Sequence, residues 1–458
     1  MPVLAAGVFL SVLNTTMVNV ALPTIRDVFN VGEAGAGWLA TLYSLFFGIA
    51  TPFYGRLGDR YGLRRLYITG MVIFATSSLA AAFVPTSAFW LLVLFRVGQG
   101  IGSAAIPSLG TAMITRVIPS ERRGASIGII AASVGAGQAF GPTLGGSLTE
   151  FISWRAVFLI SAIVLLLIPV QFRIFSAERN PHPKPVDWIG GAALAATIAG
   201  IMIGVGSIQQ QGLGSFLVIA SFSVAVVAFL VTFLRQRSVR FPFIDPQLLA
   251  NRRFVLSSFT AFMMMSAAIS TLIISPFLLE DVNGLRTSQV GLVLLAQAGM
   301  VTVLSRPVGR LADRFDGLLL SSIGLSLVFL VTLLFSTVAV GWSTAALVPL
   351  FLIFGLGQAS TFSPLQTTVT RTIPRELAGT GLGLYNMLFF VGSAFGAAVA
   401  TALLTARAST DSLLPIYFGP EEFSQFGDAY LYGVTAAGIG LILLQVARRI
   451  PAPSQEDD

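Results

Sequence analysis

The chain has 458 residues, of which 55% are hydrophobic and only 10% are charged, with a formal net charge of +7. A soluble domain carries roughly 25% charged residues, so the composition excludes an ordinary soluble protein and predicts an all-α polytopic membrane protein. The chain has no cysteine, which excludes disulfides and thiol chemistry. Its basic residues lie in short loops between apolar stretches, a pattern typical of membrane topology and not of a nucleic-acid surface.

Fourteen apolar stretches are long enough to cross about 30 Å of hydrocarbon. The first six spans are expected near 4–24, 36–54, 67–84, 89–112, 125–149 and 155–175. An inserted pair is expected near 188–207 and 214–234. The last six are expected near 254–279, 288–308, 318–337, 344–366, 377–405 and 429–447. We therefore predict an N-terminal six-helix bundle at 1–175, connectors and an inserted helix pair at 176–253, a C-terminal six-helix bundle at 254–450 and a tail at 451–458.

Most of the 27 basic residues fall in alternate loops, beginning with the loop after the second span. Cytoplasmic loops of membrane proteins are enriched in lysine and arginine. The distribution therefore predicts that the N- and C-termini and the tail are cytoplasmic. It favours a multi-pass protein of a cell inner (cytoplasmic) membrane.

The segment at 55–65 reads GRLGDRYGLRR, and a weaker copy, GRLADRFDG, lies at 309–317. We expect each to form a charged turn between two spans, and two copies of one turn indicate two related halves. Asp59 can pair with an arginine or with a helix N-terminus across the seam between the halves, which would hold one conformation and break in another. A generic charged loop is the alternative. The gating candidates here are Gly55, Gly58, Asp59, Arg60, Gly62, Arg65, Asp313 and Arg314.

The fifth span contains the run GQAFGPTLGG at 137–146. Gly137, Gly141 and Gly145 recur every four residues and form a smooth stripe on which another helix can pack closely. Pro142 removes a backbone donor and is expected to kink the helix. Pro142, Gly145 and Gly146 have no copy in the second half, which indicates a hinge or seal; tight packing alone is the alternative.

These motifs resemble those of the major facilitator superfamily. The segment at 55–65 resembles its signature loop, RVGQG at 96–100 its fourth-helix arginine motif, and 137–146 its fifth-helix antiporter motif. The run LNTTMVNVALP at 13–23 resembles the first-helix motif of the fourteen-helix drug:proton antiporter family of multidrug, quaternary ammonium and tetracycline exporters. The resemblance implies two six-helix bundles plus an inserted pair, and secondary active export of hydrophobic or amphipathic, often cationic, compounds by alternating access. Its expected partners are a small-molecule substrate, protons and membrane lipids, and a monomer is expected.

One residue departs from that family, because Asn14 stands where its members usually carry aspartate, and asparagine cannot carry a proton. Three explanations stay open. A rim acid such as Glu150 or Glu280 carries the proton; the chain is an uncoupled facilitator or lipid-type flippase; or an original aspartate has been replaced. Arg96 is the one basic residue deep inside a predicted span, where the resemblance implies a part in coupling and a structural arginine is the alternative. The coupling candidates are Asn14, Arg96, Glu150 and Glu280.

Polar and aromatic side chains inside apolar spans are candidates for lining a substrate cavity. They are Asn14, Asn19, Tyr43, Phe46, Gln99, Gln138, Met264, Gln297, Phe362, Gln366, Asn386, Phe389 and Phe390. The single histidine, His182, falls in a proline-rich connector, and there is no phosphate-binding glycine loop. We therefore expect neither an enzyme nor a cofactor nor a metal site. A non-transporting membrane sensor or scaffold is a further alternative, which the two turn motifs argue against.

Overall fold

The computed structural model describes residues 1–174, 185–212, 214–406 and 418–451. Every regular element in these ranges is a helix, and fourteen helices are long and apolar enough to cross a membrane. The predicted all-α fold with fourteen spans is thereby confirmed. Most of the connector predicted to begin at 176 and nearly all of the predicted tail lie outside the described residues, and the predicted domain boundaries stay a prediction.

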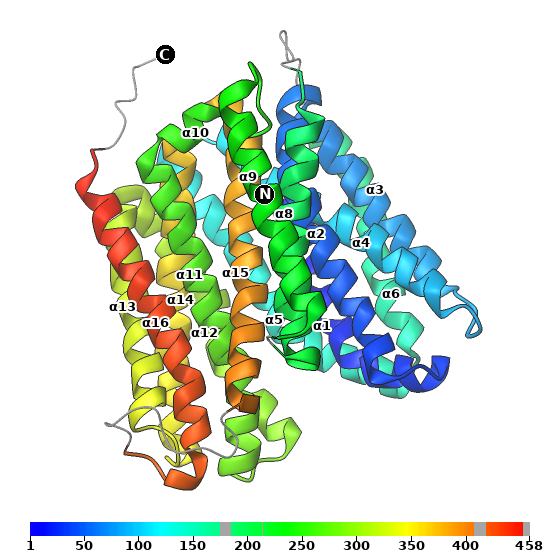
Figure 1. The fold of residues 1–458 in the computed structure, drawn as a ribbon, viewed down its shortest axis with the longest axis vertical. Coiled ribbons are helices and arrows are strands. Elements are labelled where there is room, and N and C mark those ends of the chain that lie inside the picture. Colours follow the sequence, from blue (N-terminus) through cyan, green and yellow to red (C-terminus); the bar gives the residue numbers. More distant parts are fainter. Residues whose placement is uncertain (175–184, 213, 407–417, 452–458) are drawn as a thin grey trace.

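The first half of the chain forms six spans, which follow the blue-to-cyan colours of Figure 1. They are α1 (Pro2–Phe29), α2 (Glu33–Tyr61), α3 (Leu63–Ala82), α4 (Phe89–Val117), α5 (Arg123–Phe151) and a sixth span made of α6 (Trp154–Ala162), a 3-10 segment (Ile163–Leu167) and α7 (Ile168–Ile174). Each is a long apolar run, and the cap residue Ser153 begins α6 by accepting from the backbone N–H of Arg155.

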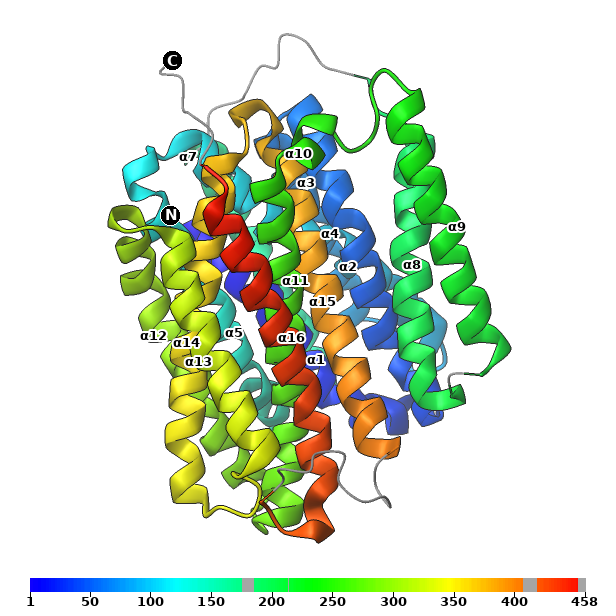
Figure 2. The same cartoon turned by 60° about the vertical axis from the view of Figure 1, so that its left-hand side comes forward.

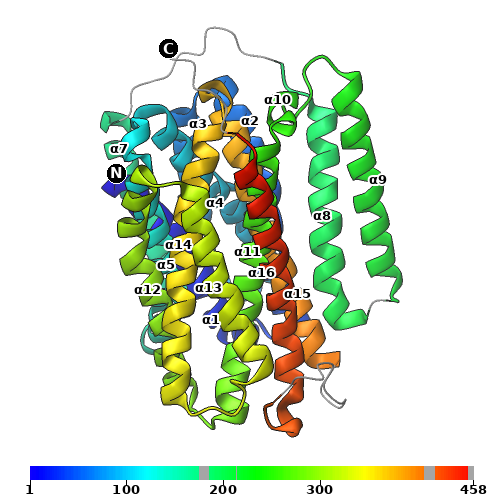
Figure 3. The same ribbon diagram turned by 90° about the vertical axis from the view of Figure 1, so that its left-hand side faces the viewer.

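The inserted pair consists of α8 (Trp188–Gln211) and α9 (Phe216–Ser238). Figures 2 and 3 show the pair at one edge of the bundle. Helix α8 contacts α2 and α15, whereas α9 exposes an almost continuous apolar surface. Asp187 caps α8 through Gly190 N–H and forms an ion pair with Arg235 of α9 at 2.8 Å. Burial raises the pKa of Asp187, but the hydrogen bonds from Arg235 and Gly190 outweigh it and hold that pKa below its usual value.

The second half begins with a short helix and continues with six spans. They are α10 (Pro246–Ala250), α11 (Arg252–Phe277) extended by a π-helical turn (Leu278–Val282), α12 (Thr287–Arg314), α13 (Gly317–Thr337), α14 (Thr344–Thr372), α15 (Ala378–Ala406) and α16 (Ser424–Arg449). We call the end of the bundle where α2, α4, α12 and α14 finish the basic end. It lies at the top of Figure 2, beside α10.

The prediction of a charged turn at 55–65 is wrong about where the turn lies. Helix α2 continues through most of this segment to Tyr61, and the turn itself is the single residue Gly62, whose φ of 97° favours glycine. Likewise, α12 continues to Arg314 instead of ending near 308. Hydropathy falls where polar residues begin, but the backbone hydrogen bonds of a helix persist into the polar boundary of a membrane.

The two halves meet along two seams, α2 against α15 and α5 against α12. Glycines permit close backbone contact at both. A Cβ on Gly55 would collide with the carbonyl of Gly379, and a Cβ on Gly124 would collide with the carbonyl of Gly309. The two crossings therefore correspond to each other, as the two copies of the repeated segment do. They place the charged ends of α2 and α12 against the opposite half.

Candidate functional site

The carboxylate of Asp59, near the end of α2, binds the first turn of α15 in the other half. It accepts hydrogen bonds from the backbone N–H groups of Gly379 (2.9 Å) and Thr380 (2.6 Å) and from the Thr380 hydroxyl (2.7 Å). Arg116 at the end of α4 adds an ion pair at 2.7 Å. The first N–H groups of a helix have no partner within it and carry partial positive charge. Asp59 therefore acts as a helix cap supplied by the opposite half.

Asp313, near the end of α12, repeats this arrangement in the reverse direction. It accepts from the backbone N–H groups of Gly124 (2.6 Å) and Ala125 (2.9 Å) in the first turn of α5, and Arg371 lies 3.4 Å away. We call these two sites the Asp59 clasp and the Asp313 clasp. Each joins the halves at the basic end, so the structure is closed there.

The other gating candidates of the two repeats have different surroundings. Gly58 packs against Leu63 so closely that a Cβ would have to displace it. The guanidinium of Arg60 lies over the ring of Tyr61, 5.1 Å from its centroid. Arg65 and Arg314 are exposed, and their side chains have no hydrogen bond or ion pair within the described chain. The clasps thus use Arg116 and Arg371 in place of the arginines inside the repeated segment.

The glycine stripe of α5 packs against α1. A Cβ on Gly137 would lie 2.9 Å from Val12, one on Gly141 would collide with Thr16, and one on Gly145 would lie 2.7 Å from Met17. Gly146 has room for a side chain, since its nearest neighbour would be 3.8 Å away. Helix α5 continues through Pro142, which is exposed. Tight packing explains the three stripe glycines, while a hinge or seal at Pro142 and Gly146 stays a prediction.

Arg96 is fully buried and is held entirely by neutral groups. Its guanidinium donates to the Leu39 carbonyl (3.1 Å), to Asn14 Oδ1 (2.9 Å) and to Gln99 Oε1 (2.8 Å). It also lies over the ring of Tyr43, 4.2 Å from the centroid, a favourable cation–π contact. Within the described chain its Nη2 has no hydrogen-bond partner, and no carboxylate contacts it.

This arginine is the centre of a polar network that joins five spans, α1, α2, α3, α4 and α6. Asn14 of α1 donates to Ser161 of α6 at 2.8 Å, and Gln99 of α4 donates to Ser78 of α3 at 2.7 Å. The Tyr43 hydroxyl accepts from Thr15 and donates to Ser103. The amide oxygens of Asn14 and Gln99 face the guanidinium because each amide nitrogen is committed to a serine.

The acids considered for coupling lie elsewhere. Glu150 is exposed at the end of α5, and Glu280 is exposed in the π-helical turn after α11; neither contacts Arg96. Sequence reasoning did not single out Asp428, a carboxyl that is only 1% exposed in the first turns of α16. Because Asp428 lies near the start of a helix, where exposed acids are common, nothing in the sequence indicates that it is buried.

A cluster of four phenylalanines crosses the seam between α2 and α15. Phe47 contacts Phe390 with ring centroids 4.4 Å apart, Phe390 contacts Phe389 at 5.3 Å, and Phe389 contacts Phe362 of α14 at 5.0 Å. Sequence reasoning named Phe46 instead of its neighbour Phe47. Phe46 is partly buried, but the ring that reaches the other half belongs to Phe47.

Three buried amides of the second half have an unpaired polar atom within the described chain. These are Gln297 Oε1, Gln366 Oε1 and Asn386 Nδ2; the amide nitrogen of Gln297 donates to Gln358. Gln366 follows Phe362 by one helical turn, and Asn386 precedes Phe390 by one turn, so these amides share a helix face with the phenylalanine cluster. Such atoms require water or a ligand.

The remaining substrate candidates are separated from this cluster. Asn19 is exposed on α1, Gln138 is partly buried on α5, and Met264 is buried in α11. Tyr43 and Gln99 are committed to the Arg96 network. Among the described residues, no group of three or more His, Cys, Asp or Glu side chains has metal-binding geometry.

Fourteen spans in two related halves, closed against each other at one end, define a secondary transporter. Residues 4–397 match the Major Facilitator Superfamily, and the chain belongs to that family. It is a transporter and not an enzyme.

Relatives cover most of the chain. It is 29% identical over 458 residues to the uncharacterized MFS-type transporter YcnB of Bacillus subtilis, covering 99% of this chain and 96% of that protein. It is 30% identical over 413 residues to the multidrug resistance protein Stp of Mycobacterium tuberculosis, covering 88% of this chain and 75% of that protein.

Solved structures share the fold. The crystal structure of the human organic anion transporter MFSD10 (TETRAN) has a TM-score of 0.65 at 17% identity, covering 97% of this chain and 98% of that one. A bacterial homologue of the iron transporter ferroportin, in an outward-facing state, has a TM-score of 0.65 at 13% identity, covering 98% of this chain and 100% of that one. At these identities the likeness concerns the fold alone.

Proposed function

We propose that the chain exports hydrophobic or amphipathic small molecules from the cytoplasm by alternating access. The observation that carries the proposal is the pair of reciprocal clasps, in which Asp59 and Asp313 each cap a helix of the opposite half. Both clasps must break when the halves separate at the basic end. The excess of arginine there makes it the cytoplasmic side of a cell inner membrane, and the described structure is then the state closed to the cytoplasm.

The proposed substrate class follows from the phenylalanine cluster and the amides beside it. Four aromatic rings offer an adaptable apolar wall, and the unpaired atoms of Gln366 and Asn386 offer a few hydrogen bonds. A site of this kind suits compounds that are largely apolar with one or two polar groups. The similarity to the multidrug resistance protein Stp supports the same class.

Reconstitution in liposomes tests the proposal with a matched pair of variants on α12. Gly309→Val places a side chain against the Gly124 carbonyl and prevents closure of the basic end, whereas Gly291→Val enters open space on the same helix. We expect wild type and Gly291→Val to move a fluorescent amphiphile such as ethidium, and Gly309→Val to lose most of this flux. Equal flux in all three proteins would contradict transport by closure at this seam, and ligand binding without flux in wild type would favour a sensor.

The second candidate is uncoupled transport, by a facilitator or lipid-type flippase, and the surroundings of Arg96 favour it. The side chains of Asn14 and Gln99 do not titrate, and their amide oxygens both accept hydrogen bonds from Nη1 of Arg96. Proton antiport would need another acid, such as Glu150, Glu280 or the buried Asp428. An internal pH dye in the same liposomes separates the two. Proton movement on adding substrate supports antiport. A substrate flux that is the same with and without an imposed pH gradient supports the facilitator.

A further inference from the structure

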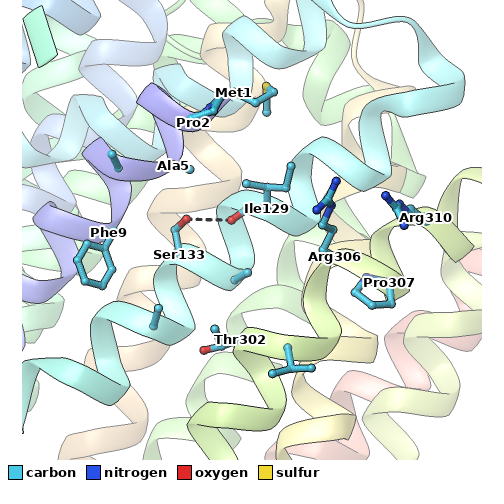
Figure 4. Close-up of a pocket in the computed structure, with 14 residues that line it drawn as sticks. Met1, Pro2, Ala5, Phe9, Ile129, Ser133, Thr302, Arg306, Pro307 and Arg310 are labelled. Carbon is cyan, nitrogen blue, oxygen red and sulfur yellow. Dashed lines mark hydrogen bonds between the residues drawn. The ribbon is translucent and has the colours of Figure 1, made fainter.

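An open groove of about 1050 Å³ lies at the basic end, between α1, α5 and α12. Figure 4 shows its walls: the first turns of α1 with Ala5 and Phe9, the α5 turn with Ser133, and the α12 turn with Arg306 and Arg310. The lining runs along α12 from 302 to 310, a rise of about 12 Å along a helix axis. That length is close to one half of the hydrocarbon thickness.

The groove is on the outer surface of the bundle, separate from the path between the halves. At this level α5 and α12 are in backbone contact, as Gly128 against Ser305 shows, so the interior is sealed behind them. Arg306 and Arg310 are exposed, whereas Ser305, which packs against Gly128, is buried. A membrane-embedded groove of this kind faces lipid.

The four polar side chains of the groove fall into two sets. The hydroxyl of Ser133 donates to the Ile129 carbonyl (2.9 Å), and the hydroxyl of Thr302 donates to the Ala298 carbonyl (2.8 Å), so both are satisfied by their own helices. The guanidiniums of Arg306 and Arg310 have no hydrogen bond or ion pair within the described chain. The groove thus offers an apolar wall with free cationic donors at one end.

We propose that this groove binds an anionic phospholipid of the leaflet at the basic end. Arg306 and Arg310 are one helical turn apart on the same face, and two guanidiniums at that spacing can hold one phosphate through charge-assisted, bidentate hydrogen bonds. The acyl chain lies along Ala5, Phe9 and Val303. A polar solute would find no donor along this wall, and a neutral amphiphile would leave the guanidiniums unused.

The bound lipid bridges the two halves, because α1 and α5 belong to the first and α12 to the second. It therefore favours the state in which the basic end is closed. The site does not depend on what the protein transports, so binding can be tested without a transport assay.

Native mass spectrometry of the purified full chain tests the proposal. Phosphatidylglycerol and phosphatidylcholine with identical acyl chains are titrated separately, and the bound fractions are compared. We expect wild type to bind phosphatidylglycerol at least tenfold more tightly, and Arg306→Gln/Arg310→Gln to lose this preference. The control is Arg252→Gln/Arg449→Gln, which removes two exposed arginines at the same end but outside the groove and should keep the preference.

Two further arms identify the ligand. Ala132→Trp fills the apolar wall and leaves both guanidiniums in place, so it should weaken phosphatidylglycerol binding while thermal unfolding verifies that the protein is folded. Glycerol phosphate at millimolar concentration should not compete; full competition would mean that the site holds a free anion. Equal affinity for the two lipids in wild type, or an equal loss of preference in the control variant, would overturn the proposal.

Discussion

The Asp59 clasp can be weakened by a change that preserves the size of the side chain. Each carboxylate oxygen accepts two hydrogen bonds, one from the Gly379 N–H and Arg116, the other from the Thr380 N–H and hydroxyl. Asp59→Asn removes the negative charge and turns one oxygen into an NH2 group that faces donors. Two of the four contacts are therefore lost whichever way the amide is oriented.

The size of the effect follows from those two contacts. A hydrogen bond to a charged group contributes about 1.5–3 kcal/mol, which gives roughly 3–6 kcal/mol for two. The Arg116 side chain is 20% exposed and regains some hydration, so we take the lower value, about 3 kcal/mol. At 1.4 kcal/mol per factor of ten, closure at the basic end should become roughly 100-fold less favourable.

Distances between spin labels measure this equilibrium directly. The chain has no cysteine, so labels on Tyr61→Cys and Phe315→Cys, exposed at the ends of α2 and α12, report the separation of the halves without background. Asp59→Asn should add a longer-distance population that is minor in the parent. Glu376→Gln makes the same charge change at an exposed site just before α15 and should not. Identical distributions in both variants would refute the assignment of Asp59 as a clasp.

Three other changes test separate parts of the structure. Asn14→Asp puts a titratable carboxyl against Arg96, and we expect substrate-driven proton flux, read by an internal pH dye, to appear or increase; no change would remove position 14 from coupling. Gly141→Val should lower the free energy of unfolding by about 1–3 kcal/mol because it overpacks α1, whereas Gly146→Val, whose Cβ meets only Val20 at an ordinary contact distance of 3.8 Å, should not; equal denaturation midpoints would contradict the packing. Because the pKa of Asp187 is lowered by folding, its stabilisation is present above the usual carboxyl pKa and is lost as pH falls through the lower folded value. Asp187→Asn should therefore be less stable than wild type at pH 7, and thermal melts of the two proteins should converge in strong acid.

The architecture could be predicted from sequence because its causes are local. Apolar runs of membrane-spanning length define the helices, and the copy of the 55–65 segment at 309–317 reveals the two halves. The ends of the helices were harder to predict from the sequence. Polar residues mark the membrane boundary, while the helix itself ends where the backbone turns, at Gly62 and not at Gly55. The clasp partner Arg116 was missed, although the sequence carries a usable signal: Arg116 lies in TRVIP at 115–119, and Arg371 lies in the similar segment TRTIP at 370–374.

The pairing of buried polar groups was beyond sequence reasoning, because it depends on which faces of several helices meet. The Arg96 network brings together α1, α2, α3, α4 and α6, and no spacing within one helix specifies that assembly. An arginine side chain is not deprotonated in proteins, and Asn14 and Gln99 cannot titrate, so this network keeps the same charge in every conformation. A charge that never changes cannot carry a proton cycle. If ions drive transport, the carrier is a carboxyl outside the network or the substrate itself.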